Sequence, residues 1–172
     1  MPARPRRSLL RGLMGIAASE LCLHVIRPTL VYLDRHCASA EALLLGAAAS
    51  QSALGRALDH QHGHGLYRIA ALRHQLLWDR HLARDPELAS RIRGLASQHA
   101  FLAAPHLELT VNLRYATAIA WMLIEAEDTP LPAADDLIGL ARVWRQVFQP
   151  QGRLRDFTDA WHLCIGSVNQ VA

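Results

Sequence analysis

The chain has 172 residues and a mass of 19.1 kDa, a size that suits one domain with a sizeable core. Its formal net charge is +3, but the four arginines among the first eleven residues carry +4, which leaves the remainder at −1. A nearly neutral body argues against a nucleic-acid-binding face on the folded part, because such a face needs clustered cations. Only the N-terminal arm is basic.

Composition favours helices. Hydrophobic residues make up 51% of the chain and aromatic residues only 6%, with alanine and leucine throughout. Cys22, Cys37 and Cys164 show no CxxC spacing, so they indicate neither a disulfide framework nor a zinc site, and we expect no cofactor. No apolar stretch reaches the roughly 20 uncharged residues of a membrane span. We therefore expect a soluble, all-α protein with no membrane span.

Three parts are expected along the chain. Residues 1–18 form a basic N-terminal arm and an extra helix, residues 19–165 form the main domain, and residues 166–172 form a tail. The domain opens on a helical segment in which Pro28 causes a kink or break, because proline lacks the amide donor. An added helix behind a basic arm suits contact with a partner or with another copy of the chain.

The central helix is predicted over about 40–51, with Ser39 as its N-cap and Glu41 in its first turn. A Gly- and His-rich loop, expected to form a short hairpin, follows it. Asp85 and Pro86 are a strong helix start. The other predicted helices cover 70–83, 88–96, 106–124, 135–148 and 156–165, of which 106–124 is the most apolar and is expected to be the spine of the core.

The loop contains the alternating histidines His60, His62 and His64. On one extended strand their rings would project on the same side, as transition-metal ligands do. Only Asp59 offers a further ligand nearby, and glycines interrupt the loop. The favoured interpretation is a flexible polar loop without a metal, and a three-histidine metal site is the alternative.

Four patterns occur in a familiar order. They are a helix ending Ser50-Gln51-Ser52, a loop reading Gly65-Leu66-Tyr67-Arg68-Ile69, a helix opening Asn112-Leu113-Arg114-Tyr115-Ala116, and a late helix with an aromatic pair. The set resembles the lysozyme-like domain of soluble lytic transglycosylases. It is more closely similar to small phage-encoded proteins of that type, in which the helix ends Gln-Glu-Ser and the loop reads Gly-Leu-Tyr-Gln-Ile. The resemblance covers roughly residues 20–160 and implies a lysozyme-like helical fold with a short loop or hairpin.

In that family the helix-terminal glutamate is the general acid that protonates the glycosidic oxygen of peptidoglycan. Gln51 stands at the matching position, and Arg68 stands where the loop has glutamine. An amide does not exchange a proton at neutral pH, so an acid worth about 10²- to 10⁴-fold in rate is lost. Asp59 is the alternative acid, although a solvated loop carboxylate is its favoured interpretation. The residues for which the resemblance implies substrate contact are Ser52, Gly65, Tyr67, Arg68, Asn112 and Tyr115.

The sequence therefore leads to the hypothesis of a catalytically inactive lysozyme-like virion structural protein, located in the tail or head-to-tail region of a phage and in the host cytoplasm during assembly. Its expected partners are other virion proteins and further copies of itself. Two alternatives stay open. One is an active lytic transglycosylase that uses Asp59, and the other is a binding module that holds peptidoglycan without cleaving it.

Overall fold

A computed structural model describes residues 15–166 of the chain, except the side chains of residues 59, 60 and 100. The N-terminal helical run consists of α1 (Ala18–Leu21), the π-helical turn η1 (Cys22–Ile26) and α2 (Arg27–Tyr32). The predicted break at Pro28 falls just after this π turn, where the missing amide donor is accommodated. The expected extra helix lies mostly outside the described residues, and within them the chain becomes helical at Ala18.

After α3 (Ala38–Ser52), the chain forms the hairpin β1 (Asp59–His60) and β2 (Gly63–His64). The remaining elements are α4 (Ala71–Arg80), η2 (Leu82–Arg84), α5 (Pro86–Arg93), α6 (Gln98–Ala103), η3 (Pro105–Leu107), α7 (Glu108–Val111), α8 (Leu113–Ala126), α9 (Leu137–Phe148) and α10 (Leu154–Cys164). Strands are confined to this hairpin, whose two strands have two residues each, in the described part of the chain. The all-α prediction is therefore confirmed.

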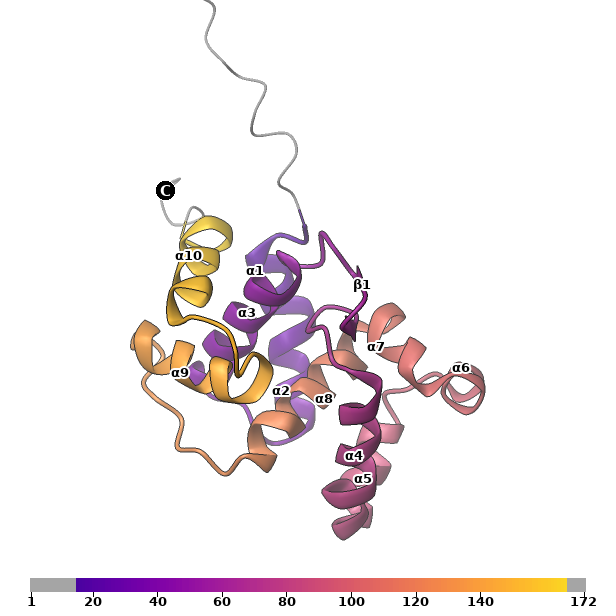
Figure 1. Cartoon of the computed structure of the whole chain (residues 1–172). Helices are drawn as coiled ribbons and strands as arrows, with labels where there is room; N and C mark the ends of the chain where they lie inside the picture. The colour runs from indigo at the N-terminus through magenta and orange to yellow at the C-terminus, as the bar shows by residue number, and fades with distance from the viewer. Residues whose placement is uncertain (1–14, 167–172) are drawn as a thin grey trace, which may run out of the picture.

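The centre of the fold is α3. It packs against α9 and α10 on one side and against α8 and the N-terminal run on the other, with α4 to α7 further out beyond α8 (Figure 1). Gly46 lets α10 approach closely, because a Cβ there would overlap the Phe157 ring. The helix starts earlier than predicted, since the Cys37 thiol accepts from the Ala40 amide at 3.4 Å. Ser39 therefore lies within the first turn and is not the N-cap.

The predicted helix over 106–124 is interrupted at Asn112. The backbone of Asn112 is extended, with φ −123° and ψ 98°, and its side-chain oxygen accepts from the Tyr115 amide at 3.0 Å. This is an N-cap, so the stretch divides into η3, α7 and α8. From Tyr115 to Ile124, every residue of α8 is buried, so α8 is the core spine that the apolar pattern predicts.

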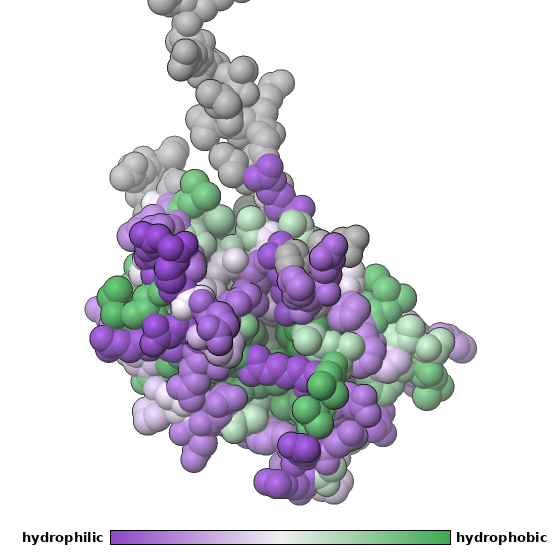
Figure 2. All heavy atoms as spheres, viewed as in Figure 1, coloured by the Kyte–Doolittle hydropathy of each residue, from purple (hydrophilic) through white to green (hydrophobic). Residues whose placement is uncertain are grey.

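On the face seen in Figure 2, hydrophilic groups of the described residues are interleaved with smaller apolar areas. Over residues 15–166, no helix combines the length and the apolar character that crossing a membrane requires.

Candidate functional site

The last turn of α3 brings Gln51 into the interior. Its side chain is 3% exposed. The amide nitrogen donates to the backbone carbonyl of Tyr67 at 3.2 Å, and the amide oxygen accepts from Nε2 of Gln149 at 3.4 Å. Gln51 therefore connects the end of α3 to the loop that follows the hairpin and to the residue that follows α9.

Ser52 makes a second connection to the same loop. Its hydroxyl donates to the backbone carbonyl of Leu66 at 2.7 Å and accepts from the Gly55 amide at 3.0 Å. Past Ser52 the chain turns sharply, because Ala53, Leu54 and Gly55 all have positive φ. Both polar residues at the end of α3 thus hold the loop in place.

The loop itself depends on Gly65, which has φ +71°. A Cβ at this position would overlap the carbonyl of Leu109, so only glycine fits. Tyr67 is fully buried, and its hydroxyl lies 3.1 Å from Thr117 Oγ1. Burial raises the pKa of Tyr67 and keeps the phenol neutral. Arg68 follows with φ +47°, and the chain then re-pairs with the hairpin through a bridge between His64 and Ile69.

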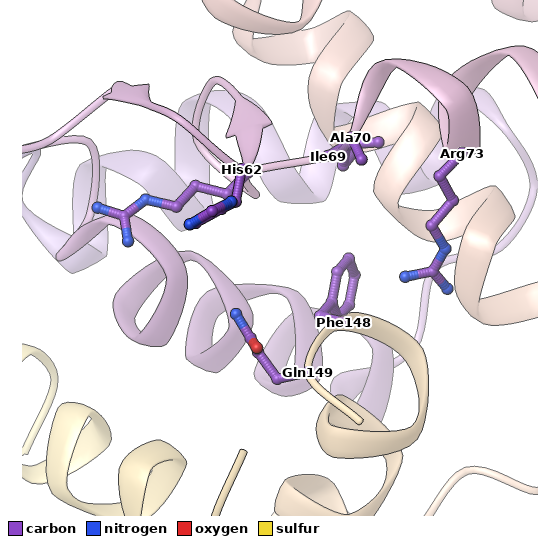
Figure 3. A pocket seen from close by; sticks show the side chains of 7 residues that line it. His62, Ile69, Ala70, Arg73, Phe148 and Gln149 are labelled. Carbon is purple, nitrogen blue, oxygen red and sulfur yellow. The ribbon is translucent and has the colours of Figure 1, made fainter. Parts of the chain in front are cut away.

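A cavity of about 260 Å³ lies between this loop, α4 and the end of α9. The residues that line it are His62, Arg68, Ile69, Ala70, Arg73, Phe148 and Gln149. Figure 3 shows His62, Arg73 and Gln149 around one opening, with the Phe148 ring between Gln149 and Arg73. The lining carries two guanidinium groups, and none of its members is a carboxylate.

A second polar cluster joins the buried side of α4 to His106 and Tyr115. His74 is 1% exposed, and its Nδ1 and Nε2 lie 2.9 Å from His106 Nδ1 and 2.7 Å from the Tyr115 hydroxyl. The Trp78 indole donates to the same hydroxyl at 3.0 Å. The pKa of His74 falls to about 4, first because of burial and then because His106 and His64 are nearby. His74 is therefore neutral and structural at physiological pH.

The predicted substrate-contacting residues fall into two groups. Ser52, Gly65, Tyr67 and Arg68 lie with Gln51 at the junction of α3 and the loop, and only Arg68 lines the cavity.

Asn112 and Tyr115 belong to the second group, and Tyr115 is part of the His74 cluster. Besides capping α8, Asn112 donates to the Leu95 carbonyl at 2.8 Å and to the buried carboxylate of Glu108 at 2.9 Å. Both residues hold helices together at these positions.

The hairpin places the histidines of this loop in different surroundings. His62 lies at the turn and lines the cavity, whereas His64 lies on β2 and stacks against His106 with ring centroids 5.9 Å apart. The side chains of Asp59 and His60 lie outside the described residues. Among the side chains that are described, no three His, Cys, Asp or Glu groups gather as a metal site would require.

Sequence reasoning missed Gln149, Arg73 and the His74 cluster. A Gln-Pro break after the helix at 135–148 marks the position of Gln149, but not its contact with Gln51. For α4 the apolar pattern predicts Leu72 on the inner face, whereas Leu72 is 67% exposed and His74 is buried with Leu77. The hydrogen-bonded cluster holds His74 inside, so the polar residue replaces the expected leucine.

Comparison of the chain with protein-family models, with curated proteins and with solved structures gave no significant match. The all-α class is a property of the structure itself. The lysozyme-like fold and the phage origin stay predictions that rest on the four sequence patterns, from the helix ending Ser50-Gln51-Ser52 to the late helix with an aromatic pair.

The Gln51 contacts predict how a carboxyl group behaves at this position. In Gln51→Glu, an ionised carboxylate would be buried against the Tyr67 carbonyl oxygen, so we expect the pKa of the new carboxyl group to rise above its usual value of about 4.3. A folded-state pKa above the unfolded one means that stability is kept below pH ~4 and lost as the pH rises through the folded pKa. Urea unfolding should show a loss of about 2 kcal/mol or more at pH 8.

The matched control is Gln75→Glu, because Gln75 is exposed on α4. This variant should keep the stability of the wild type at both ends of the pH range. Equal stability of Gln51→Glu and wild type at pH 8 would contradict the assigned hydrogen bonds.

The His74 cluster predicts acid sensitivity. The folded-state pKa of about 4 lies below the unfolded value of about 6.5, so the stabilisation from neutral His74 is complete above pH ~6.5 and is lost as the pH falls through 4. The loss should be on the order of 3 kcal/mol. The free energy of unfolding, measured against pH, should fall less steeply in His74→Gln than in the wild type. His99→Gln, at an exposed histidine, should leave the slope unchanged, and an unchanged slope in His74→Gln would refute the account.

Proposed function

We propose that this protein is a catalytically inactive lysozyme-like domain that serves as a structural component of a phage particle. The observation that carries the proposal is the state of Gln51. The position that matches the family's general acid holds a buried amide whose nitrogen and oxygen both have protein partners. Such a group neither donates a proton to a glycosidic oxygen nor retrieves one from water.

The surroundings of Gln51 support the same proposal. Ser52, Gly65 and Tyr67 match the family pattern, and all three stabilise the loop within this chain. Ser52 bonds the loop to α3, Gly65 allows it to pack against α7, and Tyr67 bonds it to α8. Their structural contacts remain necessary even when no reaction takes place. A chain of this type therefore keeps the motif while losing the acid.

A structural role in a particle requires surfaces that bind neighbouring subunits. Large apolar side chains on the described surface include Leu72 at 67%, Leu102 at 85% and Val111 at 64% exposed. The basic arm over residues 1–11 adds a charged segment. Other virion proteins and further copies of the chain are the partners we propose, with the tail or head-to-tail region as the location and the host cytoplasm as the site of assembly.

Two alternatives differ in what happens at peptidoglycan. A binding module without cleavage is favoured by the cavity that Gln149, the hydrogen-bond partner of Gln51, helps to line, because this cavity has room for part of a ligand. An active transglycosylase requires another acid, for which Asp59 is the candidate.

Purified sacculi separate these three functions. We expect the wild-type protein to release no muropeptides, because Gln51 supplies no proton. Release by Gln51→Glu would show that a substrate still reaches this position. Release by the wild type that disappears in Asp59→Asn would establish the enzyme instead. Co-sedimentation of the wild type with sacculi, without release, would favour the binding module.

The structural role predicts where the protein is found. If a phage encodes the chain, mass spectrometry of gradient-purified particles should detect it in a fixed copy number per particle. Its presence in infected-cell lysate but not in purified particles would contradict the role in the virion.

A further inference from the structure

We propose that the cavity at the C-terminal end of α8 binds the basic N-terminal arm, residues 1–11, of a second copy of this chain. The inference builds on the proposed contact between copies and names a site for it. It requires neither a phage particle nor a lysozyme-like fold, because it rests on charge, cavity lining and chain length.

The cavity has a volume of about 270 Å³ and lies where α8 ends and the connection to α9 begins. Its lining combines apolar side chains with two carboxylates, namely Trp121, Ile124, Pro130 and Leu131 with Glu125 and Asp128. Arginine suits such a lining, because its guanidinium pairs with carboxylates while its methylene stem packs on apolar side chains.

The two carboxylates differ in what they already bind. Glu125 accepts from Nε of Arg35 at 2.8 Å and from the Trp121 indole at 3.1 Å. Asp128 is exposed, and no arginine or histidine within residues 15–166 forms a salt bridge with it. Asp128 is therefore the carboxylate that an incoming guanidinium would meet.

The charge around the cavity is strongly negative. Residues 125–136 contain five carboxylates and no arginine, and the salt bridges from Arg35 and Arg73 offset only two of them. The first eleven residues of the chain carry four arginines and no carboxylate. Opposite charges of this kind attract over about 10 Å at 0.1 M salt and steer two surfaces together.

The sequence of the arm also matches the apolar part of the lining. Residues 4–11 read RPRRSLLR, so Leu9 and Leu10 lie between Arg7 and Arg11. A segment that alternates cations with leucines satisfies the carboxylates and the apolar wall of the cavity together. A purely basic segment would leave that wall without a partner.

Reach decides which copy supplies the arm. The chain enters the fold beside the end of α3, where the Ile16 amide donates to the Leu54 carbonyl at 2.7 Å. Figure 1 shows α1 and the end of α3 at the top of the fold and the connection between α8 and α9, in orange, at the bottom. The two sites therefore lie at opposite ends of the fold.

The described residues, if packed as an ordinary domain, are about 38 Å across. Arg7 comes eight residues before residue 15, so an extended chain carries it at most about 29 Å from there. Arg7 and Arg11 of the same chain consequently fall short of the cavity. A second copy has no such limit, because it can approach the cavity from outside.

The first test is sedimentation velocity of the full-length protein over a range of concentrations. We expect reversible self-association that strengthens with protein concentration. It should weaken when the salt concentration rises from about 0.05 M to about 0.5 M, because screening shortens the range of the attraction.

Variants then assign the association to the arm and to the cavity. The arm variant, Arg4→Gln with Arg6→Gln and Arg7→Gln, should weaken it about tenfold or more, and Asp128→Asn should weaken it about threefold or more. Asparagine tolerates the positive φ of 48° at this position, so the fold is kept. Asp79→Asn removes the same charge from an exposed site on α4 and should associate as the wild type does.

A synthetic peptide of residues 1–14, added to the full-length arm variant, locates the contact by NMR. The indole Nε1–H resonance of Trp121 should shift in a saturable manner, because the Glu125 carboxylate that accepts from it gains a cation nearby. The same peptide with glutamine in place of its arginines should leave this resonance unchanged.

The proposal is overturned if the wild type stays monomeric at low salt, if the arm variant associates as tightly as the wild type, or if the peptide leaves the Trp121 resonance in place. A monomeric wild type whose Trp121 resonance changes in the arm variant would put the arm on its own chain and would also overturn it. None of these outcomes bears on Gln51, so this contact can fail while the inactive-domain proposal stands. Muropeptide release by the wild type would likewise leave the sedimentation result unchanged.

Discussion

The burial of α3 on nearly all sides is the constraint on which the rest of the structure depends. Its sequence, rich in alanine with Gly46 at the centre, gives a narrow helix against which α8, α9 and α10 all pack. Burial continues to the last turn, so Gln51 and Ser52 cannot turn to water and must bond to protein. Their partners are the carbonyls of Leu66 and Tyr67, and this requirement fixes the loop that carries Arg68.

Because of this constraint, the motif residues have roles in packing and hydrogen bonding that do not depend on a catalytic reaction. Ser52 and Tyr67 contribute hydrogen bonds inside the chain, and Gly65 contributes the space that the Leu109 carbonyl needs. Gln51 stands where the resemblance to lytic transglycosylases places a carboxylic acid, and there the amide serves as both donor and acceptor. The proposed loss of the acid is therefore compatible with a stable fold, because Gln51 joins α3 to Gln149.

Local patterns in the sequence predict the elements that local forces determine. The apolar run and its polar end predict α3 to within two residues at its N-terminus, and Asp85-Pro86 predicts the start of α5, where the Asp85 carboxylate accepts from the Leu88 amide. The sequence pattern does not reveal the break at Asn112, because the apolar spacing continues through it. The break is made by the Asn112 side chain, which caps the start of α8. Contacts between distant residues are also hidden: Gln51 and Gln149 are 98 positions apart, and no pattern along the chain pairs them.

The Gln51 carboxamide is the centre of the account, and its state in solution is directly measurable. Side-chain amide NMR of the wild-type protein should show two slowly exchanging Nε2 protons with nuclear Overhauser contacts to the Tyr67–Arg68 backbone and to the Gln149 side chain. That result would establish a buried structural amide at residue 51. Fast exchange with water and no contact to the loop would instead show a free group in an open cleft, and would contradict the account.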